Sequence, residues 1–171
     1  MDDDIPCPAD PLPAGAEAAL KAASRAWHEP DTARRHLAAA RQIAPQHRAV
    51  LIGHYKFHFY RTELAEAAPW ALACVRQSLE RLGLERDWRR LPEAAGQAPF
   101  AGRVLHWPAE ARFLAYALKA YGYVRVRLGD LEDGCAALAA VAALDPEDAC
   151  GAAGLLAVVA RGPDADDDGE G

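Results

Sequence analysis

The sequence predicts an all-α protein built from antiparallel helix pairs, and three observations support this fold class. Alanine, the best helix former, supplies much of the hydrophobic fraction of 51%. β-Branched residues are scarce and occur in runs as short as Val124-Arg125-Val126, too short to require strands. Proline, glycine and Asp-Pro pairs divide the chain into segments of helical length that carry apolar residues at three- and four-residue spacing.

One helical domain is expected over residues 14–161. Residues 1–13 are acidic and rich in proline, and residues 162–171 are acidic, so both ends are expected to be disordered. The net charge of -6 comes from these two ends, and the sequence between them is nearly neutral. Because a nucleic-acid-binding protein would carry a concentrated basic stripe, no nucleic-acid partner is expected.

The cysteines and the apolar runs bear on the cellular compartment. Four widely spaced cysteines without a C-x-x-C pair argue against a zinc knuckle and a redox motif. The acidic N-terminus is unlike a signal peptide, and the longest apolar run, residues 149–160, is too short to span a membrane. We therefore expect a soluble, cytoplasmic protein with reduced thiols and no membrane contact. The alanine- and arginine-rich composition is typical of a bacterial source.

The first helix pair is expected before residue 46. A helix over residues 14–28 is broken at Pro30, and Asp31 is the expected N-cap of a second helix over residues 32–43. Pro45 closes this pair.

The second pair is expected over residues 47–82. Its first helix covers residues 47–60, and Thr62 is the expected N-cap of the next helix, which ends near Gly83. Pro69 lies inside this stretch, so the helix either begins near Ala68 or kinks at the proline.

Residues 83–108 interrupt the helical pattern with several prolines and glycines. An irregular segment of this length is either functional or a surface excursion fixed by its aromatic residues Trp88, Phe100 and Trp107. Pro108 suits the first turn of a long helix to residue 128.

The last pair and a final helix follow this long helix. Gly129-Asp130 forms the turn of the pair, and residues 131–144 form its second helix. Asp145-Pro146 is expected to cap a last helix that runs to residue 161.

The last pair carries a recognisable pattern. Its positions are Leu118, Gly122 and Leu128-Gly129-Asp130, followed by Leu131, Leu138, Val141 and Leu144-Asp145-Pro146. Ala33, Leu37, Ala40, Ile43 and Pro45 repeat the second-helix part at the same offsets. This pattern resembles the tetratricopeptide repeat (TPR), whose period is about 34 residues. The resemblance implies TPR-like pairs stacked as a short right-handed solenoid, with a C-terminal capping helix.

The sequence departs from the repeat at several positions. Residue 134 is glycine and residue 125 is arginine, where the family favours alanine and tyrosine, and the first unit has His28 in place of the glycine turn. The middle pair fits only with one residue inserted near Thr62. Residues 87–89 (Asp-Trp-Arg) and 113–134 are similar to small TPR-like proteins found beside bacterial nitrogen-fixation genes.

The groove that the resemblance implies carries aromatic and basic side chains. Tyr116, Lys119, Tyr123 and Arg127 follow at three- and four-residue steps on one helix face, and Lys56 and Tyr60 are expected to join them. We expect this surface to bind another protein or a peptide with acidic and apolar side chains, as an adaptor or a chaperone-like protein. The alternative is a solvated amphipathic face.

Neither catalytic motifs nor the known binding motif of the TPR family indicate a function other than this binding surface. The sequence contains no Gly-rich phosphate loop, G-x-S-x-G motif or Cys-His nucleophile pair, so we expect no enzyme, no catalytic residue and no cofactor. The carboxylate clamp known in the TPR family requires several groove residues of which only Lys119 matches, so this function is not transferred.

A second hypothesis starts from His54 and His58, which lie one turn apart on the same helix. Such a pair can hold a divalent metal, and the protein would then be an accessory or assembly factor of a bacterial metalloenzyme system such as nitrogen fixation. Two ligands are too few for a tight site, and residue 55 is tyrosine where an H-E-x-x-H motif has glutamate. No metal site is therefore assigned, and both rings are alternatively packing residues.

Overall fold

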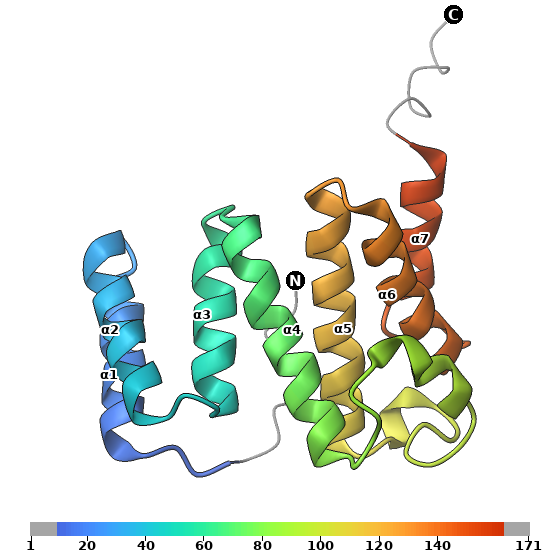
Figure 1. The fold of residues 1–171 in the computed structure, drawn as a ribbon, viewed down its shortest axis with the longest axis horizontal. Helices are drawn as coiled ribbons and strands as arrows, with labels where there is room; N and C mark the ends of the chain where they lie inside the picture. The colour runs from blue at the N-terminus through green and yellow to red at the C-terminus, as the bar shows by residue number, and fades with distance from the viewer. Residues whose placement is uncertain (1–9, 163–171) are drawn as a thin grey trace, which may run out of the picture.

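The computed structural model describes residues 10–162, and within this range the chain forms helices and no β-strand, which confirms the all-α class (Figure 1). The α-helices are α1 (Ala14–Arg25), α2 (Pro30–Ile43), α3 (Arg48–Tyr60), α4 (Leu64–Arg81), α5 (Ala109–Arg127), α6 (Leu131–Leu144) and α7 (Ala152–Arg161). Two 3-10 helices, η1 (Trp88–Ala94) and η2 (Val104–His106), lie between α4 and α5.

Consecutive helices stand side by side in one row, from α1 and α2 at one end to α7 at the other (Figure 1). The main hydrophobic core runs from α3 to α7, with Leu79, Leu114 and Leu138 buried in it. Two smaller clusters attach α1 and α2 to α3, one around Val50 and the other around Phe57. The core is thus continuous over most of the row and divided at its N-terminal end.

Two expected helix caps differ from the structure. Helix α2 begins at Pro30 and not after Asp31, because proline at the first helical position has the φ of a helix and its missing N–H needs no partner there. Thr62 does not cap α4. It lies at φ 61° directly after α3, where its N–H donates to the Phe59 carbonyl oxygen at 3.0 Å and the next N–H, of Glu63, donates to His58 at 2.9 Å. This pattern terminates α3, and α4 begins at Leu64.

Pro69 lies inside α4, in its second turn. Of the two alternatives for this helix, a start near Ala68 is wrong, because the helix already begins at Leu64. The proline side chain is on the exposed side of α4, while the neighbouring Ala67 and Ala68 are buried. A solvent-facing proline leaves the core contacts of the helix in place.

The irregular segment after α4 is packed on the rest of the molecule. Its aromatic residues Trp88, Phe100 and Trp107 are all buried, and Phe100 meets Trp107 edge-on with 5.3 Å between ring centroids. Arg89 of η1 forms an ion pair with Asp133 of α6. The segment therefore packs mainly against α6, with a smaller contact to α4, and it lies away from α3 (Figure 1).

Helix α7 begins later than the sequence predicts. Residues 145–151 form turns, in which Asp145 accepts a hydrogen bond from the Cys150 N–H at 2.7 Å. Asp148 has φ 53° and accepts from the N–H groups of Ala153 and Gly154. Asp145 thus holds the turn and Asp148 caps the first turn of the helix, so α7 begins at Ala152 rather than at Pro146.

Residues 1–13 and 162–171 are expected to be disordered. Most of them lie outside the described range, and only residues 10–13 and Gly162 lie inside it. Leu12 packs against the cluster that contains Ala16 and Val50, and Asp10 forms an ion pair with Arg81 of α4. This part of the N-terminal segment thus lies along the helices. None of the described helices combines the length and the apolar composition needed to cross a bilayer.

Candidate functional site

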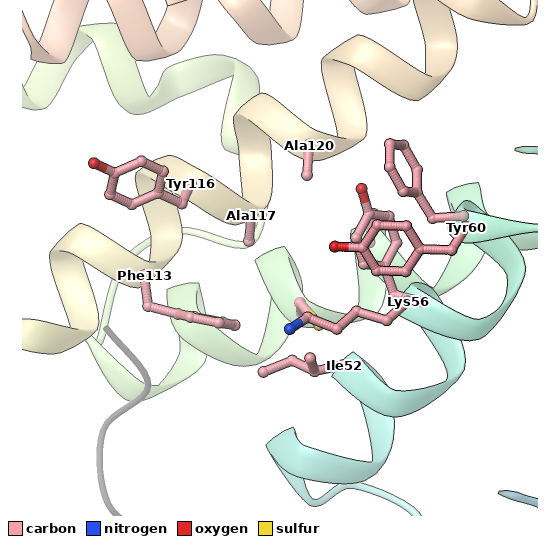
Figure 2. A pocket seen from close by; sticks show the side chains of 11 residues that line it. Ile52, Lys56, Tyr60, Phe113, Tyr116, Ala117 and Ala120 are labelled. Carbon is pink, nitrogen blue, oxygen red and sulfur yellow. The ribbon is translucent and has the colours of Figure 1, made fainter. Parts of the chain in front are cut away.

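An apolar cleft opens between α3 and α5, with α4 forming its floor (Figure 2). Counted with its mouth, it has a volume of about 540 Å³. Its walls and floor are formed by Ile52, Tyr55, Lys56, Phe59, Tyr60, Ala71, Cys74, Phe113, Tyr116, Ala117 and Ala120. The walls are largely aromatic and the floor consists of small side chains, so the cleft has the shape and polarity to take a bulky apolar group.

The wall on α3 follows from helical spacing. Ile52, Tyr55, Lys56, Phe59 and Tyr60 recur at steps of three and four residues, which places them on one face of the helix. Stacking of the Tyr55 and Phe59 rings, with centroids 5.3 Å apart, gives this face a rigid aromatic surface.

The cleft contains three of the side chains predicted to bind a partner, Lys56, Tyr60 and Tyr116. Lys56 and Tyr60 reach from α3 across the cleft toward α5, where Tyr116 and Phe113 lie (Figure 2). Tyr60 is 52% exposed at the rim. An amine and a phenol therefore stand at the opening of a pocket whose interior is apolar.

Two further predicted residues lie beyond the cleft on α5. Tyr123 is 6.1 Å from Phe59 between ring centroids, so it continues the aromatic surface of the cleft. Arg127 donates a hydrogen bond to the Tyr123 hydroxyl at 2.8 Å, and its guanidinium carbon lies 5.7 Å from the Tyr123 ring. The pair thus places a cation beside the end of the aromatic surface.

Lys119 does not join this group. Its amine lies close to Gly151, at 3.4 Å from the position of a Cβ on that residue, in the turn before α7. The residues of α5 that line the cleft are Phe113, Tyr116, Ala117 and Ala120, and position 119 is at the edge of their face. Its side chain therefore extends toward the C-terminal turn rather than toward α3.

The hydroxyl of Tyr55 is the unusual polar group of the cleft. Tyr55 is only 7% exposed, and no residue in the described range hydrogen-bonds to its hydroxyl. Burial raises the pKa of this phenol, so it stays a neutral donor. A buried hydroxyl without a partner costs about 1–3 kcal/mol, which a ligand atom could recover by accepting its hydrogen bond.

Sequence reasoning missed Ile52, Tyr55 and Phe59, and it also missed the floor residues from α4. The regular spacing of the α3 residues was a usable signal, but an aromatic stripe at helical spacing predicts a core as readily as a groove. The three alanines and the cysteine of the cleft carry no signal that distinguishes them from other packing residues.

The aromatic surface continues from the cleft toward α1. The ring of Trp27, which follows α1, lies 6.2 Å from that of Tyr60 and 5.7 Å from that of Phe57, both in edge-on contacts. Aromatic side chains thus connect the end of α1 through α3 to Tyr123 on α5. Such a surface can contact several side chains of an extended partner.

The two histidines of the metal hypothesis have separate surroundings. His54 is buried, stacks on Trp70 with 4.0 Å between ring centroids, and has its Nε2 3.2 Å from the Leu37 carbonyl oxygen. His58 places its Nδ1 2.7 Å from a carboxylate oxygen of Glu63. Burial lowers the pKa of His54 to about 4, so the ring is neutral near pH 7. Within residues 10–162, no three His, Cys, Asp or Glu side chains are grouped so that they could hold a metal ion.

The helices that form the cleft are tied together by Arg48, which the sequence analysis did not single out. This side chain is fully buried at the start of α3, and it forms an ion pair with Glu110 at the start of α5, with one hydrogen bond at 3.0 Å. It also donates to Gln77 and Ser78 of α4, and its guanidinium carbon lies 4.2 Å from the centroid of the Phe113 ring in the cleft wall. One arginine thereby fixes the relative positions of all three helices around the cleft.

Comparisons with known proteins relate the chain to one bacterial sequence. No protein-family model matches the chain, and no solved structure matches it significantly. The chain is 35% identical over 130 residues to the "uncharacterized 19.8 kDa protein in nifW 5'region" of Azotobacter chroococcum mcd 1. The alignment covers 76% of this chain and 71% of the relative. The chain therefore belongs to the family of this nif-region protein.

Proposed function

We propose that the protein is a non-enzymatic interaction module, an adaptor or a chaperone-like protein, which binds a peptide segment or surface of a partner between α3 and α5. The observation that supports this most directly is the open cleft itself, where aromatic walls, a small-residue floor and the Lys56 amine occur together (Figure 2). An exposed concave apolar site with few polar groups is the usual form of a binding site.

The proposal includes a TPR-like arrangement. In a right-handed solenoid of three helix pairs, α1, α3 and α5 would be the first helices of the pairs and would line the concave surface, with α7 as the capping helix. This assignment agrees with the positions of Trp27, Tyr60 and Tyr123 on one continuous aromatic surface. The pairs would then present one groove to a partner rather than separate pockets.

Site-specific photo-crosslinking in a nitrogen-fixing bacterium tests the proposal. Benzoylphenylalanine in place of Tyr60, at the rim of the cleft, should give a discrete crosslinked product. The matched control position is Leu105 in η2, which is 72% exposed but does not line the cleft. A product at both positions, or at position 105 alone, would contradict a partner site between α3 and α5.

A second proposal concerns the process that the protein serves. Because the relative is located in a nif gene region, we propose that this chain is an accessory or assembly protein of the nitrogen-fixation system. The partner in the cleft would then be a protein of that system. A version in which His54 and His58 handle metal is less well supported, since each ring is already engaged with another residue.

Growth on dinitrogen distinguishes these versions. Deletion of the gene should slow growth without fixed nitrogen and leave growth with ammonium unchanged. A gene carrying His58→Gln should restore growth, whereas Lys56→Glu should not. The metal-handling version predicts the reverse order, and unchanged growth of the deletion strain would separate the protein from nitrogen fixation.

A further inference from the structure

One hydrogen-bond donor of the cleft is left unsatisfied by the described residues. The Tyr55 side chain lines the cleft and is only 7% exposed, and its hydroxyl has no hydrogen-bond partner among them. Phe59 stacks beside it, while Phe113 and Tyr116 form the opposite wall on α5 (Figure 2). A groove with aromatic walls suits an extended, proline-containing segment. Polyproline II backbone has no internal hydrogen bonds, so each of its carbonyl oxygens can accept one from the groove.

The sequence contains such a segment directly before the first described residue. Residues 1–9 include the run Ile5-Pro6-Cys7-Pro8, in which two prolines follow a branched apolar side chain. Proline fixes its own φ and disfavours helical backbone at the residue before it, so the sequence of this run favours an extended chain. The other end of the chain is unsuited to an apolar cleft, because residues 163–171 offer no apolar side chain larger than that of Pro163.

The contacts of Asp10 show where residues 1–9 join the described part of the chain. Asp10 forms an ion pair with Arg81 near the end of α4, and its Oδ2 lies 3.8 Å from Nε2 of His47, directly before α3. Arg81 also lies 4.0 Å from Glu110 in the first turn of α5. Asp10 is therefore held where the beginnings of α3 and α5 meet the end of α4, which are the three helices that form the cleft.

The cleft begins next to this junction. Glu110 is paired with Arg48, whose guanidinium carbon lies 4.2 Å from the ring centroid of Phe113 in the cleft wall. From Ile52 to Tyr60 on α3 the cleft extends over about 12 Å. Nine residues in polyproline II conformation span about 28 Å, so residues 1–9 are long enough to follow the whole cleft from Asp10.

From these features we infer that residues 1–9 bind as an extended segment in the cleft of their own chain. Ile5 enters the apolar space between α3 and α5, and a carbonyl oxygen of the segment accepts the hydrogen bond of Tyr55. Because Asp10 tethers the segment beside the cleft, its effective concentration there is roughly millimolar, and weak contacts are enough to keep it bound. Resting on the proposed function, a partner segment has to displace residues 1–9 in order to bind.

Intramolecular photo-crosslinking of the purified full chain tests this inference. Benzoylphenylalanine in place of Ile5 should form links to peptides of α3 and α5 within one chain, mapped by mass spectrometry. The matched control is the same residue in place of Ala165 near the other end of the chain, which should not link to these walls. Tyr55→Phe should lower the yield of the links at least two-fold. Tyr60→Phe, which removes a hydroxyl from a ring that is 52% exposed, should leave the yield unchanged.

A second measurement avoids the bulky photo-reactive group. In the nitrogen-15 NMR spectrum of the full chain, Ile5→Asp should shift the amide signals of both cleft walls, including those of Phe59 and Ala117. Leu105→Asp is the matched control, because it makes the same kind of change at a leucine that is 72% exposed and does not line the cleft. Its shifts should be confined to the neighbourhood of η2, and thermal melting verifies that both variants remain folded.

The outcomes separate this inference from the proposed function. The absence of links from position 5 to α3 and α5, or unchanged cleft signals in Ile5→Asp, would overturn the inference and leave the proposed function standing. Links that join two chains would identify the segment of a second copy as the occupant and overturn binding within one chain. In the nitrogen-fixing bacterium, Ile5→Asp should raise the yield of the partner product at position 60 at least two-fold, and an unchanged yield would overturn displacement. A segment bound in the cleft, with no partner product at position 60 even in Ile5→Asp, would overturn the proposed function alone.

Discussion

At the residue scale, Arg48 is the charged side chain on which the helices around the cleft depend. It is fully buried and meets Glu110, whose side chain is itself only 16% exposed. Truncation of one member of a buried pair leaves the other charge without compensation. We therefore expect Arg48→Ala to lower the free energy of unfolding by about 3–5 kcal/mol, measured by urea denaturation.

Arg103 provides the matched control for this substitution. It also forms an arginine–glutamate pair, with Glu147 at 2.9 Å, but both side chains are mostly exposed. Because solvent screens exposed pairs, Arg103→Ala should cost at most about 1 kcal/mol. Equal effects of the two substitutions would show that the Arg48 network does not hold α3, α4 and α5 together.

A second residue-scale prediction concerns pH. Burial lowers the pKa of His54 to about 4 from its ordinary value of 6.5, so between these values the unfolded chain takes up a proton that the folded chain does not. Stability should therefore fall as the pH is lowered from 6.5 to 4, by on the order of 2 kcal/mol from this residue. Urea midpoints measured across this range should fall less steeply for His54→Phe than for the unchanged protein.

The control for this measurement is His106→Phe, which changes an exposed histidine of η2. This variant removes a ring that lies at the surface, and so tests whether removing any histidine is enough to change the pH dependence. If His54→Phe also keeps it, the loss of stability at acid pH arises from the carboxylates and not from His54.

At the element scale, the contact between α5 and α6 depends on glycine. A Cβ on Gly134 would lie 2.7 Å from the backbone nitrogen of Val126 and 2.9 Å from the carbonyl oxygen of Gly122. Backbone atoms cannot move aside without displacing the helix, so the two helices would have to separate. This explains why the sequence has glycine at a position where the repeat that it resembles favours alanine.

Gly134→Ala should accordingly destabilise the protein by about 1–3 kcal/mol, despite the better helix propensity of alanine. Gly154→Ala in α7 is the matched change in an open environment, where the nearest atom to a new Cβ is Asp148 Oδ2 at 3.4 Å. That variant should be neutral or more stable by up to about 1 kcal/mol. Differential scanning calorimetry of both variants compares them, and an equally stable Gly134→Ala would contradict the close helix contact.

Helices could be predicted where apolar residues recur on one helix face and a strong helix-breaking sequence marks the end of the helix. The apolar spacing of α5 and α6, separated by Gly129-Asp130, gave both elements nearly as they occur. The start of α7 was not predictable, because it depends on side chains of Asp145 and Asp148 that hydrogen-bond to the backbone up to six residues further on. Thr62 was misassigned because threonine is a common N-cap and is seldom found at positive φ.

The candidate site could be predicted only in part, because it also depends on contacts between residues that are far apart in the sequence. Periodicity placed Tyr116, Tyr123 and Arg127 on one face of α5, but the direction of Lys119 depends on the turn before α7, which the sequence pattern did not reveal. The pair of Arg48 and Glu110 joins residues 62 positions apart, and no local pattern connects them. Local spacing therefore identifies faces of helices, whereas the shape of a cleft depends on how distant helices meet.

At the scale of the whole molecule, the core is unequally divided along the row of helices. One continuous cluster includes residues from α3 through α7, while α1 and α2 are attached by two small clusters in which alanines predominate. Alanine buries little apolar surface, so these clusters contribute less stability than the leucine-rich core. Between the N-terminal pair and the following helices, the exposed ion pair of Arg34 with Glu63 adds little more.

We therefore expect α1 and α2 to open locally without unfolding of the remaining helices. In hydrogen exchange followed by mass spectrometry, peptides from Ala14–Arg25 and Pro30–Ile43 should exchange at least ten times faster than those from Leu131–Leu144 at neutral pH. Leu37→Ala, which weakens the attachment of α2, should increase exchange in the first pair and leave α6 unchanged. If all helices exchange together in both proteins, the row unfolds as one cooperative unit. In that case the Trp27 end of the aromatic surface is held as firmly as the cleft itself.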